Sequence, residues 1–277
     1  MDDESLPPET GVGRVALTVR NLGEVTEFYE SVVGLVVHER TGERAVLGDG
    51  ETALLELRED RSTPERPRSA AGLFHTAFRV PSRGGLGDAL ERLEEQWRLS
   101  GTADHLVSEA LYCRDPAGNG VEIYRDRPRS AWEETPDGGV RMATEPLDAT
   151  GVRQAATGEA AVPAGTDVGH VHLEVTDLDA ARAFYDDALG MTVRTTYDGA
   201  LFLAAGEYHH HVGANVWNER STPASGRGLD WFELCLPTED AVTAACDRLE
   251  GAGYAVEVAR DGVRVTDPDG IELHLRS

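Results

Sequence analysis

The sequence contains no lysine, few cysteines and no long apolar run. All 26 basic residues are arginine, and 50 Asp and Glu outnumber them, so the formal net charge is −24. Such a negative field repels phosphate backbones and anionic lipid, which excludes nucleic acid and membrane surfaces as natural partners. No 18-residue apolar segment and no signal-peptide core follow Met1, so the sequence predicts neither a membrane span nor secretion.

The three cysteines, Cys113, Cys235 and Cys246, are odd in number and far apart. They do not form a disulfide framework, and we therefore expect a cytoplasmic protein. The acidic, lysine-free composition resembles that of proteins from salt-accumulating halophiles, in which concentrated salt screens the self-repulsion. The alternative is an acidic protein from a genome that favours arginine.

A repeat divides the 277 residues into two similar halves. RNLGEVTEFYESVVG and TDLDAARAFYDDALG match at a constant offset of 156 residues, as in Leu22 and Leu178 or Gly34 and Gly190. GLFHTAFRVP and GLDWFELCLP align at the same offset, and RDPAGNGVEIY aligns with TDPDGIELHL after a small length change. The repeat predicts two homologous domains, residues 1–127 and 167–277, joined by a linker at 128–166 that is rich in Pro, Gly, Ala and acidic residues.

Each half divides again into two units of one strand, one helix and three strands. Short alternating strands such as HTAFRV and HVHLEV precede helices with apolar residues at a 3.6-residue spacing. Gly34 and Gly190 stand where a helix would end. The sequence therefore predicts an α+β fold, in which four βαβββ modules are paired into two homologous cup-shaped domains.

Histidines and acids gather on one predicted face of the second half. Six of the nine histidines lie in its strands, and period-2 alternation separates them from an apolar face. Two imidazoles and one carboxylate with open positions opposite are the non-haem Fe(II) arrangement, although Mn, Zn and Ni accept similar ligands. The residues on the polar face are His170, His172 and Glu174; His209, His211, Asn215 and Trp217; and Glu272 and His274.

At these residues the chain resembles the vicinal-oxygen-chelate superfamily of glyoxalase I, bleomycin-resistance proteins and type I extradiol dioxygenases. The resemblance covers nearly the whole chain outside the linker. Its most specific stretches are GHVHLEVTDLDAARAFYDDALGM, EYHHHVGANVWNE and SEALYCRDPAGNGVEIYRDRPRSAW, of which the last two are most similar to catechol 2,3-dioxygenases.

The resemblance implies that the second half holds the metal and that the first half is structural. It implies His170 and Glu272 as ligands, together with one histidine of EYHHHVGANVW, where alternation and the spacing to Ala214 favour His211 over His210. In the first half Glu56, His75 and Glu122 occupy three of the four glyoxalase ligand positions. The fourth position is Arg14, which cannot bind a metal, so we expect no second metal site.

Two positions depart from the dioxygenase pattern. Trp231 replaces the usual histidine in the first strand of the last module, and Arg264 replaces a tyrosine near the final DPxG turn. We therefore consider His209, His172 and Arg264 as catalytic candidates, with Arg264 also able to pair with a carboxylate of the substrate. The candidate substrate contacts are Asn215, Trp217, His274 and Trp231.

The resemblance implies an extradiol dioxygenase that uses Fe(II), O2 and a small aromatic diol. The sequence does not decide whether the chain forms a homo-oligomer. One alternative is a metal-dependent isomerase or lyase of the glyoxalase type, which consumes no O2. A second alternative is a metal-free small-molecule binding protein, against which the His, His, Glu set argues.

Overall fold

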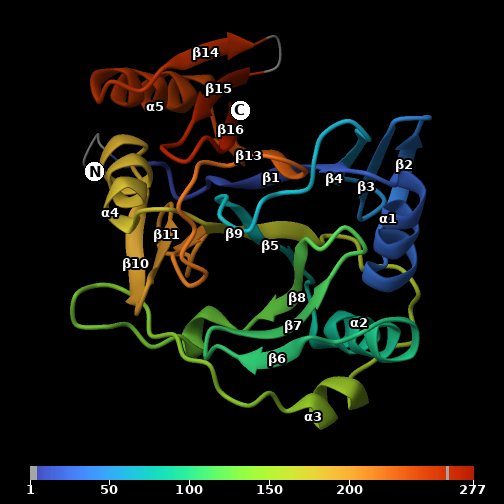
Figure 1. The fold of residues 1–277 in the computed structure, drawn as a ribbon. Coiled ribbons are helices and arrows are strands. Elements are labelled where there is room, and N and C mark those ends of the chain that lie inside the picture. Colours follow the sequence, from blue (N-terminus) through green and yellow to red (C-terminus); the bar gives the residue numbers. More distant parts are fainter. Residues whose placement is uncertain (1–4, 260–261) are drawn as a thin grey trace.

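The structure, a computed structural model, describes residues 5–259 and 262–277. All four predicted modules are present (Figure 1). The first comprises β1 (Gly11–Val19), α1 (Leu22–Phe28) with its π-helical continuation (Tyr29–Val33), β2 (Val36–Arg40), β3 (Arg44–Gly48) and β4 (Ala53–Glu59). The second comprises β5 (Gly72–Arg79), α2 (Arg83–Gln96), β6 (Gly101–Asp104), β7 (Ser108–Arg114) and β8 (Gly120–Asp126).

The second half repeats this plan. Its first module comprises β9 (Asp167–Glu174), α4 (Leu178–Arg182) with a π-helical continuation (Ala183–Ala188), β10 (Thr192–Tyr197), β11 (Ala200–Ala204) and β12 (Val212–Asn215). The last module comprises β13 (Gly228–Cys235), α5 (Glu239–Gly251), β14 (Val256–Ala259), β15 (Gly262–Thr266) and β16 (Glu272–Arg276). Between the halves lie a short 3₁₀ turn (Arg129–Ala131) and α3 (Ala149–Gln154).

The modules pair across the two halves of the sequence rather than within them. Modules one and four form one eight-stranded sheet in the order β14-β15-β16-β13-β1-β4-β3-β2, which we call the 1–4 sheet. Modules two and three form the other in the order β10-β11-β12-β9-β5-β8-β7-β6, which we call the 2–3 sheet. The α+β class and the pairing of four βαβββ modules into two cup-shaped units are thus confirmed, but each sheet draws on both halves.

This pairing has a simple origin. The first strand of every module needs an antiparallel neighbour, and alternation along that strand does not encode which module supplies it. Here β5 pairs with β9 and β1 pairs with β13. The domain limits at residues 127 and 166 stay a prediction, although neither sheet is confined to one side of them.

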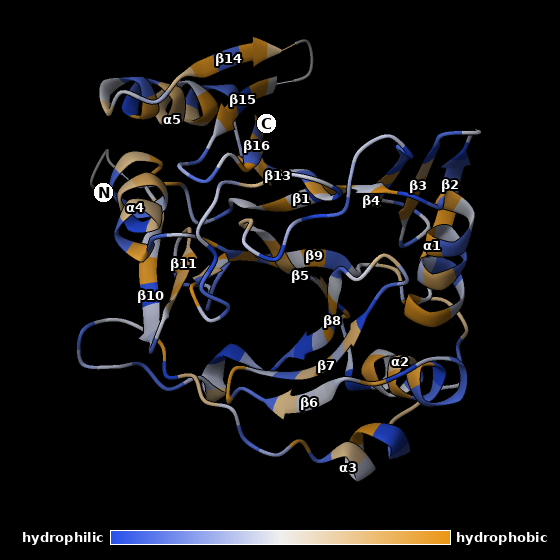
Figure 2. Ribbon diagram, in the orientation of Figure 1, coloured by the Kyte–Doolittle hydropathy of each residue, from blue (hydrophilic) through white to orange (hydrophobic). Residues whose placement is uncertain are grey.

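Helices cover one face of each sheet (Figure 1). The other face carries polar side chains, such as the pair of His170 and Glu122 in the 2–3 sheet and the pair of Arg14 and Glu56 in the 1–4 sheet. Strand β9 shows the division, because Val171 and Leu173 join the hydrophobic core whereas His170 and His172 line a cavity on the other face. In Figure 2, α2 and α5 carry both orange and blue, as expected for helices with one buried and one solvated side. Gly34 ends its helix at a φ of 92°, as the sequence predicted. Among the described residues, no helix is long and apolar enough to span a membrane.

Candidate metal centre and its cavity

Three side chains converge on one point of the 2–3 sheet. They come from its two central strands, β5 and β9, and from β8, which lies beside β5. In the strand register, Ala77 of β5 lies opposite both Glu122 of β8 and His170 of β9. His75 precedes Ala77 by two residues and so shares its face of the sheet. Ala77 is fully buried and ends at its methyl group, which leaves room above it for the three longer side chains.

The ligand atoms of this set lie in direct contact. Oε2 of Glu122 is 3.0 Å from Nε2 of His75 and 3.2 Å from Nε2 of His170. The two Nε2 atoms are 3.3 Å apart. All three residues are buried, and in the part of the chain that the structure describes they are the one group of three such ligands with its atoms within 4.8 Å. We call His75, Glu122 and His170 the triad.

The electrostatics of the triad favour the forms that bind a cation. Burial lowers the pKa of His170 to about 4, against the opposing attraction of Glu122, so the imidazole is neutral at pH 7. Burial alone would raise the pKa of Glu122, but its contacts with His170 and His75 hold that pKa well below the usual range. Neutral imidazole nitrogens and an ionised carboxylate are the states in which these side chains are metal ligands.

The structure does not bring together the ligand set expected from the sequence. Of His170, His211 and Glu272, only His170 belongs to the triad. Glu272 lies on β16 in the 1–4 sheet, opposite Trp231, and its Oε1 is 2.6 Å from Nε2 of His274. Glu272 does not lie beside His170 because the first strand of module three has module two, not module four, as its neighbour.

His211 also points elsewhere. Residues 209–211 form a bend before β12 instead of continuing the strand, so alternation does not apply to them. Nδ1 of His211 accepts a hydrogen bond from the Ala205 amide at 3.2 Å, and its ring packs on Tyr208. His211 lines a different cavity, whereas His210 lines the one beside the triad.

The equivalent face of the 1–4 sheet holds ion pairs. Glu56 on β4 accepts from Arg44 at 2.8 Å and from Arg58 at 2.7 Å, and Arg14 lies 3.6 Å away. The rings of Trp231 and His274 stack at 4.4 Å. Glu56 therefore does not join His75 and Glu122, and the guanidinium groups occupy the space that a cation would need.

A cavity of about 390 Å³ opens beside the triad. Aromatic side chains line it from β5 (Phe74) and from the β11–β12 region (Phe202 and Trp217). Residues 142–144, in the segment between the halves, line another part of it. The residues that line it are Phe74, His75, Gly101, Thr102, Ala103, His105, Ser108, Tyr112, Glu122, Met142, Ala143, Thr144, His170, His172, Tyr197, Phe202, His210 and Trp217. An aromatic ring fits a cavity of this size and lining.

Three polar side chains face this cavity near the triad. The ring of His210 packs 4.1 Å from that of His170, centroid to centroid. Nε2 of His172 is buried and has no hydrogen-bond partner among the described residues. The hydroxyl of Tyr112 lies 2.6 Å from Nε2 of His105, and burial together with the Glu122 carboxylate raises its pKa well above 10, so it stays protonated.

His209 lies behind His210 rather than in the cavity wall. Its Nδ1 is 2.7 Å from Nδ1 of His210, and its Nε2 is 3.0 Å from Oδ1 of Asp126. Asp126 also accepts from Arg79 at 3.1 Å. A chain of contacts thus runs from Asp126 through His209 to the imidazole that faces the cavity.

The other expected site residues divide between the two sheets. Trp217 lines the cavity, and Asn215 is buried beside it with its amide donating to the Leu173 carbonyl at 3.1 Å. Arg264 is exposed on β15, opposite His274, and like Trp231 it belongs to the 1–4 sheet. The structure therefore contradicts Arg264, His274 and Trp231 as neighbours of the metal centre.

The sequence carried a signal for the residues that were missed. The tyrosine expected before a DPxG turn is present as Tyr112, before the turn Asp115–Gly118, and not at Arg264 before the final turn. His75 and Glu122 are also of metal-ligand type, and the residue unfavourable to a metal there is Arg14, at the matching position in module one. That position belongs to the other sheet, so it has no bearing on the triad.

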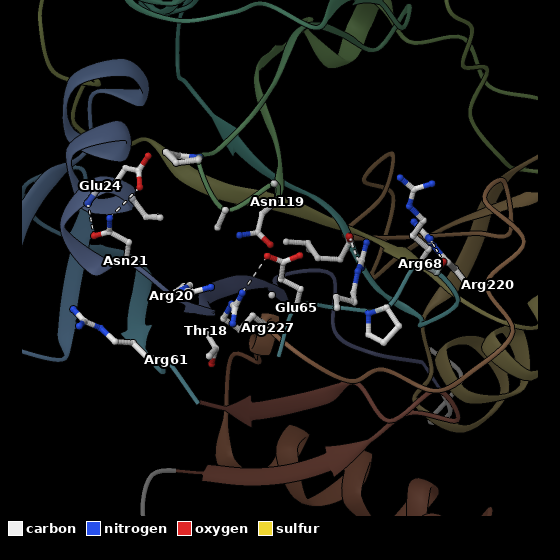
Figure 3. Close-up of a pocket in the computed structure, with 18 residues that line it drawn as sticks. Thr18, Arg20, Asn21, Glu24, Arg61, Glu65, Arg68, Asn119, Arg220 and Arg227 are labelled. Atoms are coloured by element: carbon white, nitrogen blue, oxygen red, sulfur yellow. Dashed lines mark hydrogen bonds and ion pairs between the residues drawn. The ribbon is translucent and has the colours of Figure 1, made fainter. Parts of the chain in front are cut away.

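A more polar cavity of about 710 Å³ is lined by residues of β1, of the segment around residues 61–73 and of the segment around residues 116–119, together with Arg220, Arg227 and Gly228 (Figure 3). Six arginines and two glutamates line it. Two of the arginines, Arg66 and Arg220, donate to the buried carboxylate of Glu174 at the end of β9. Part of this positive charge thus anchors the strand that carries His170.

Known proteins resemble this chain over nearly its full length. The model of the Glyoxalase/Bleomycin resistance protein/Dioxygenase superfamily matches residues 11–123 and 167–275. A catechol-2,3-dioxygenase of Bacillus subtilis is 41% identical over 273 residues, which are 95% of this chain and 96% of the relative. Glyoxalase I from Zea mays has the same fold at a TM-score of 0.59, with 15% identity, 96% of this chain and 92% of that chain covered. A solved Bacillus subtilis structure described as a candidate dioxygenase gives a TM-score of 0.68 at 14% identity, with 98% and 85% covered. The chain belongs to the glyoxalase, bleomycin resistance protein and dioxygenase superfamily.

Proposed function

We propose that the protein is an extradiol ring-cleaving dioxygenase that acts on catechol-type aromatic diols with O2. The observation that carries the proposal is the triad, in which two imidazoles and one carboxylate converge beside a cavity lined by aromatic side chains. The identity of 41% with a catechol-2,3-dioxygenase over nearly the full length of both chains supports the same reaction class. A glyoxalase-type site needs a fourth ligand, and among the described residues no further His, Cys, Asp or Glu belongs to the triad group.

The donor set of the triad fits Fe(II), and it also accepts Mn, Zn or Ni. His75, Glu122 and His170 would hold the ion, because their ligand atoms converge at 3.0–3.3 Å in a buried site. The contacts that these atoms now make with one another would be replaced by bonds to the ion. When bound, Fe(II) supplies Lewis acidity toward the diol and the redox chemistry that O2 requires.

Around the diol, His210 is placed to accept a proton. An ionised carboxylate can only accept, so Nε2–H of His209 donates to Asp126 and Nδ1 of His209 accepts from Nδ1–H of His210. Contacts with His209 and Arg79 overcome the effect of burial and hold the pKa of Asp126 below its ordinary value. This arrangement leaves Nε2 of His210 as an acceptor for a hydroxyl in the cavity.

The remaining side chains orient the substrate. The hydroxyl of Tyr112, whose proton faces Nε2 of His105, can accept a hydrogen bond from a hydroxyl in the cavity, and the unpartnered Nε2 of His172 can bond to an oxygen there. His209 is a positioning residue that fixes the tautomer of His210. The rings of Phe74 and Trp217 lie against each other at 5.5 Å and form one wall for the aromatic ring.

The test is anaerobic loading with Fe(II), addition of catechol and then exposure to air. The proposal predicts O2 uptake together with a yellow ring-opened product, and it predicts that His210→Gln slows turnover while the protein retains its iron. If the loaded protein consumes no O2 with several diols, the proposed reaction is wrong. Conversion of a hemithioacetal without O2 would instead favour an isomerase.

We also propose that the protein works in concentrated salt, and its cytoplasmic location stays a prediction. The support is a net charge of −24 with arginine as the sole basic residue type. Raising KCl from about 0.1 M to about 2 M shortens the Debye length from about 10 Å to a few Å and screens the repulsion among the acids. We expect the melting temperature to rise over this range, and a fall would contradict the proposal.

A further inference from the structure

The segment between the two halves does more than connect them. Residues 140–145, which we call the strap, pass from one edge strand of the 2–3 sheet to the other (Figure 1). At the β10 edge, the Val140 amide donates to the Arg194 carbonyl at 3.0 Å. The Tyr197 hydroxyl donates to the Met142 carbonyl at 3.0 Å.

At the β6 edge the strap is held just as closely. Asp104 and Glu145 exchange two backbone hydrogen bonds, each of 2.9 Å. Nδ1 of His105 lies 2.7 Å from the Ala143 carbonyl, and the Ala143 amide donates to the His105 carbonyl at 3.3 Å. Because β6 and β10 are the two free edges of a curled sheet, the strap closes the opening between them.

The strap also forms a wall of the cavity that holds the triad. Met142, Ala143 and Thr144 line it, and none of the three carries a charge. No arginine lines the cavity in the described part of the chain, and its one acid is Glu122 of the triad. On a ring whose diol faces the triad, a carboxylate at the strap would therefore lose its water without meeting a guanidinium, which is costly.

We propose, on the basis of the proposed function, that the strap determines specificity and selects catechols whose substituents are uncharged. Met142 and Ala143 contact the part of the ring remote from the diol, so their size limits the apolar substituent that fits. Ring-carboxylated catechols are excluded by the lack of a cation in the wall. The backbone bonds to β6 and β10 make this wall rigid, so side-chain size there translates directly into substrate size.

The experiment measures binding of diols to the Fe(II)-loaded protein without O2, through the change in tryptophan fluorescence, to which Trp217 in the cavity wall contributes. Catechol, 4-methylcatechol and 3,4-dihydroxybenzoate are the probes. We expect the first two to bind within about tenfold of each other, since one methyl group in an apolar pocket changes affinity by this order. We expect 3,4-dihydroxybenzoate to bind at least about 100-fold more weakly, because its carboxylate stays unpaired.

Variants of the strap locate the effect. Ala143→Leu should weaken 4-methylcatechol at least about tenfold more than it weakens catechol. Met142→Ala removes side-chain volume from the same wall and provides a second test if Ala143→Leu does not fold. Relative to the parent, this variant should bind 4-tert-butylcatechol better than catechol. The matched control is Arg141→Gln, whose side chain is exposed and pairs with Glu133 at 2.7 Å outside the cavity.

Equal binding of the methyl and carboxyl probes would overturn the inference, as would equal losses for all diols in Ala143→Leu. Either result leaves the proposed function intact if catechol is still cleaved with O2 uptake. If the parent binds and cleaves no diol at all, the proposed function itself has failed, and this inference fails with it.

Discussion

The Nε2 atoms of His75 and His170 lie 3.3 Å apart although 95 positions separate the two residues. Antiparallel pairing of β5 with β9 brings them together, and parallel pairing of β5 with β8 adds Glu122. Both halves of the repeat therefore contribute to one centre. All three strands lie in the central part of the 2–3 sheet, whose other face packs against the hydrophobic core, and this packing makes the centre rigid.

His75→Ala should lower the bound iron at least about tenfold. Loss of a residue that only orients a ligand already lowers metal affinity about 10–100-fold, and loss of the ligand itself should lower it at least as much. Glu122→Gln should have the same effect, because it removes the anionic donor. The measurement is metal content after anaerobic loading and desalting. His211→Ala and Glu272→Gln are the matched controls and should keep iron at the level of the parent. Iron lost in Glu272→Gln and kept in His75→Ala would place the metal in the other sheet.

Asp126→Asn should slow turnover without loss of iron. The amide can donate a hydrogen bond to Nε2 of His209, which reverses the tautomers of His209 and His210. Nε2 of His210 would then carry a proton and could no longer accept one from the diol. A fall in kcat of at least about 100-fold is expected for the loss of a positioned base. Unchanged kcat at full iron content would show that this chain of contacts has no catalytic role.

Gly169→Ala tests how tightly β9 is packed beside His170. A Cβ at this position would lie 1.8 Å from the Tyr124 hydroxyl, which itself lies 2.8 Å from the hydroxyl of Tyr208. Overpacking of this kind costs about 1–3 kcal/mol of unfolding free energy. Chemical denaturation should show this loss, whereas Gly11→Ala, with no atom within 4 Å, should match the parent. Equal stability of the two variants would mean that the strand is free to shift.

Much of this architecture could be predicted from the sequence, but the partnership of the modules could not. Periodicity and the repeat correctly gave the four modules, the helix ends and the cavity-facing side of His170 and His172 on β9. They could not show which first strands pair, because the alternation in β5 and β13 is alike. Because of that ambiguity, the sequence predicts Glu272 beside His170, whereas the structure has Glu122 there. A second difference lies at His209–His211, where a bend interrupts the strand pattern and His210, not His211, lines the cavity beside the triad.

Asp267 makes the stability of the protein depend on pH, and this effect is independent of the metal centre. It lies in the turn before β16, accepts from the Tyr185 hydroxyl at 3.0 Å, and burial raises its pKa to about 6 from an ordinary 3.8. Because the folded-state pKa is raised, its contribution to stability is full below about pH 4 and is lost as the pH rises through about 6.

Relative to Asp267→Asn, the parent should therefore lose about 3 kcal/mol of unfolding free energy between pH 4 and pH 7, which corresponds to a shift of about two pKa units. Urea denaturation of both proteins across this range measures the difference. A difference that stays constant with pH, or that moves in favour of the parent as pH rises, would contradict the assignment.

Anomalous diffraction from a crystal of the iron-loaded protein, recorded at the iron absorption edge, is the most direct test of the metal centre. We predict one strong peak between Nε2 of His75, Nε2 of His170 and the carboxylate of Glu122, facing the cavity. A peak beside Glu272 and His274, or one at His211, would contradict the account.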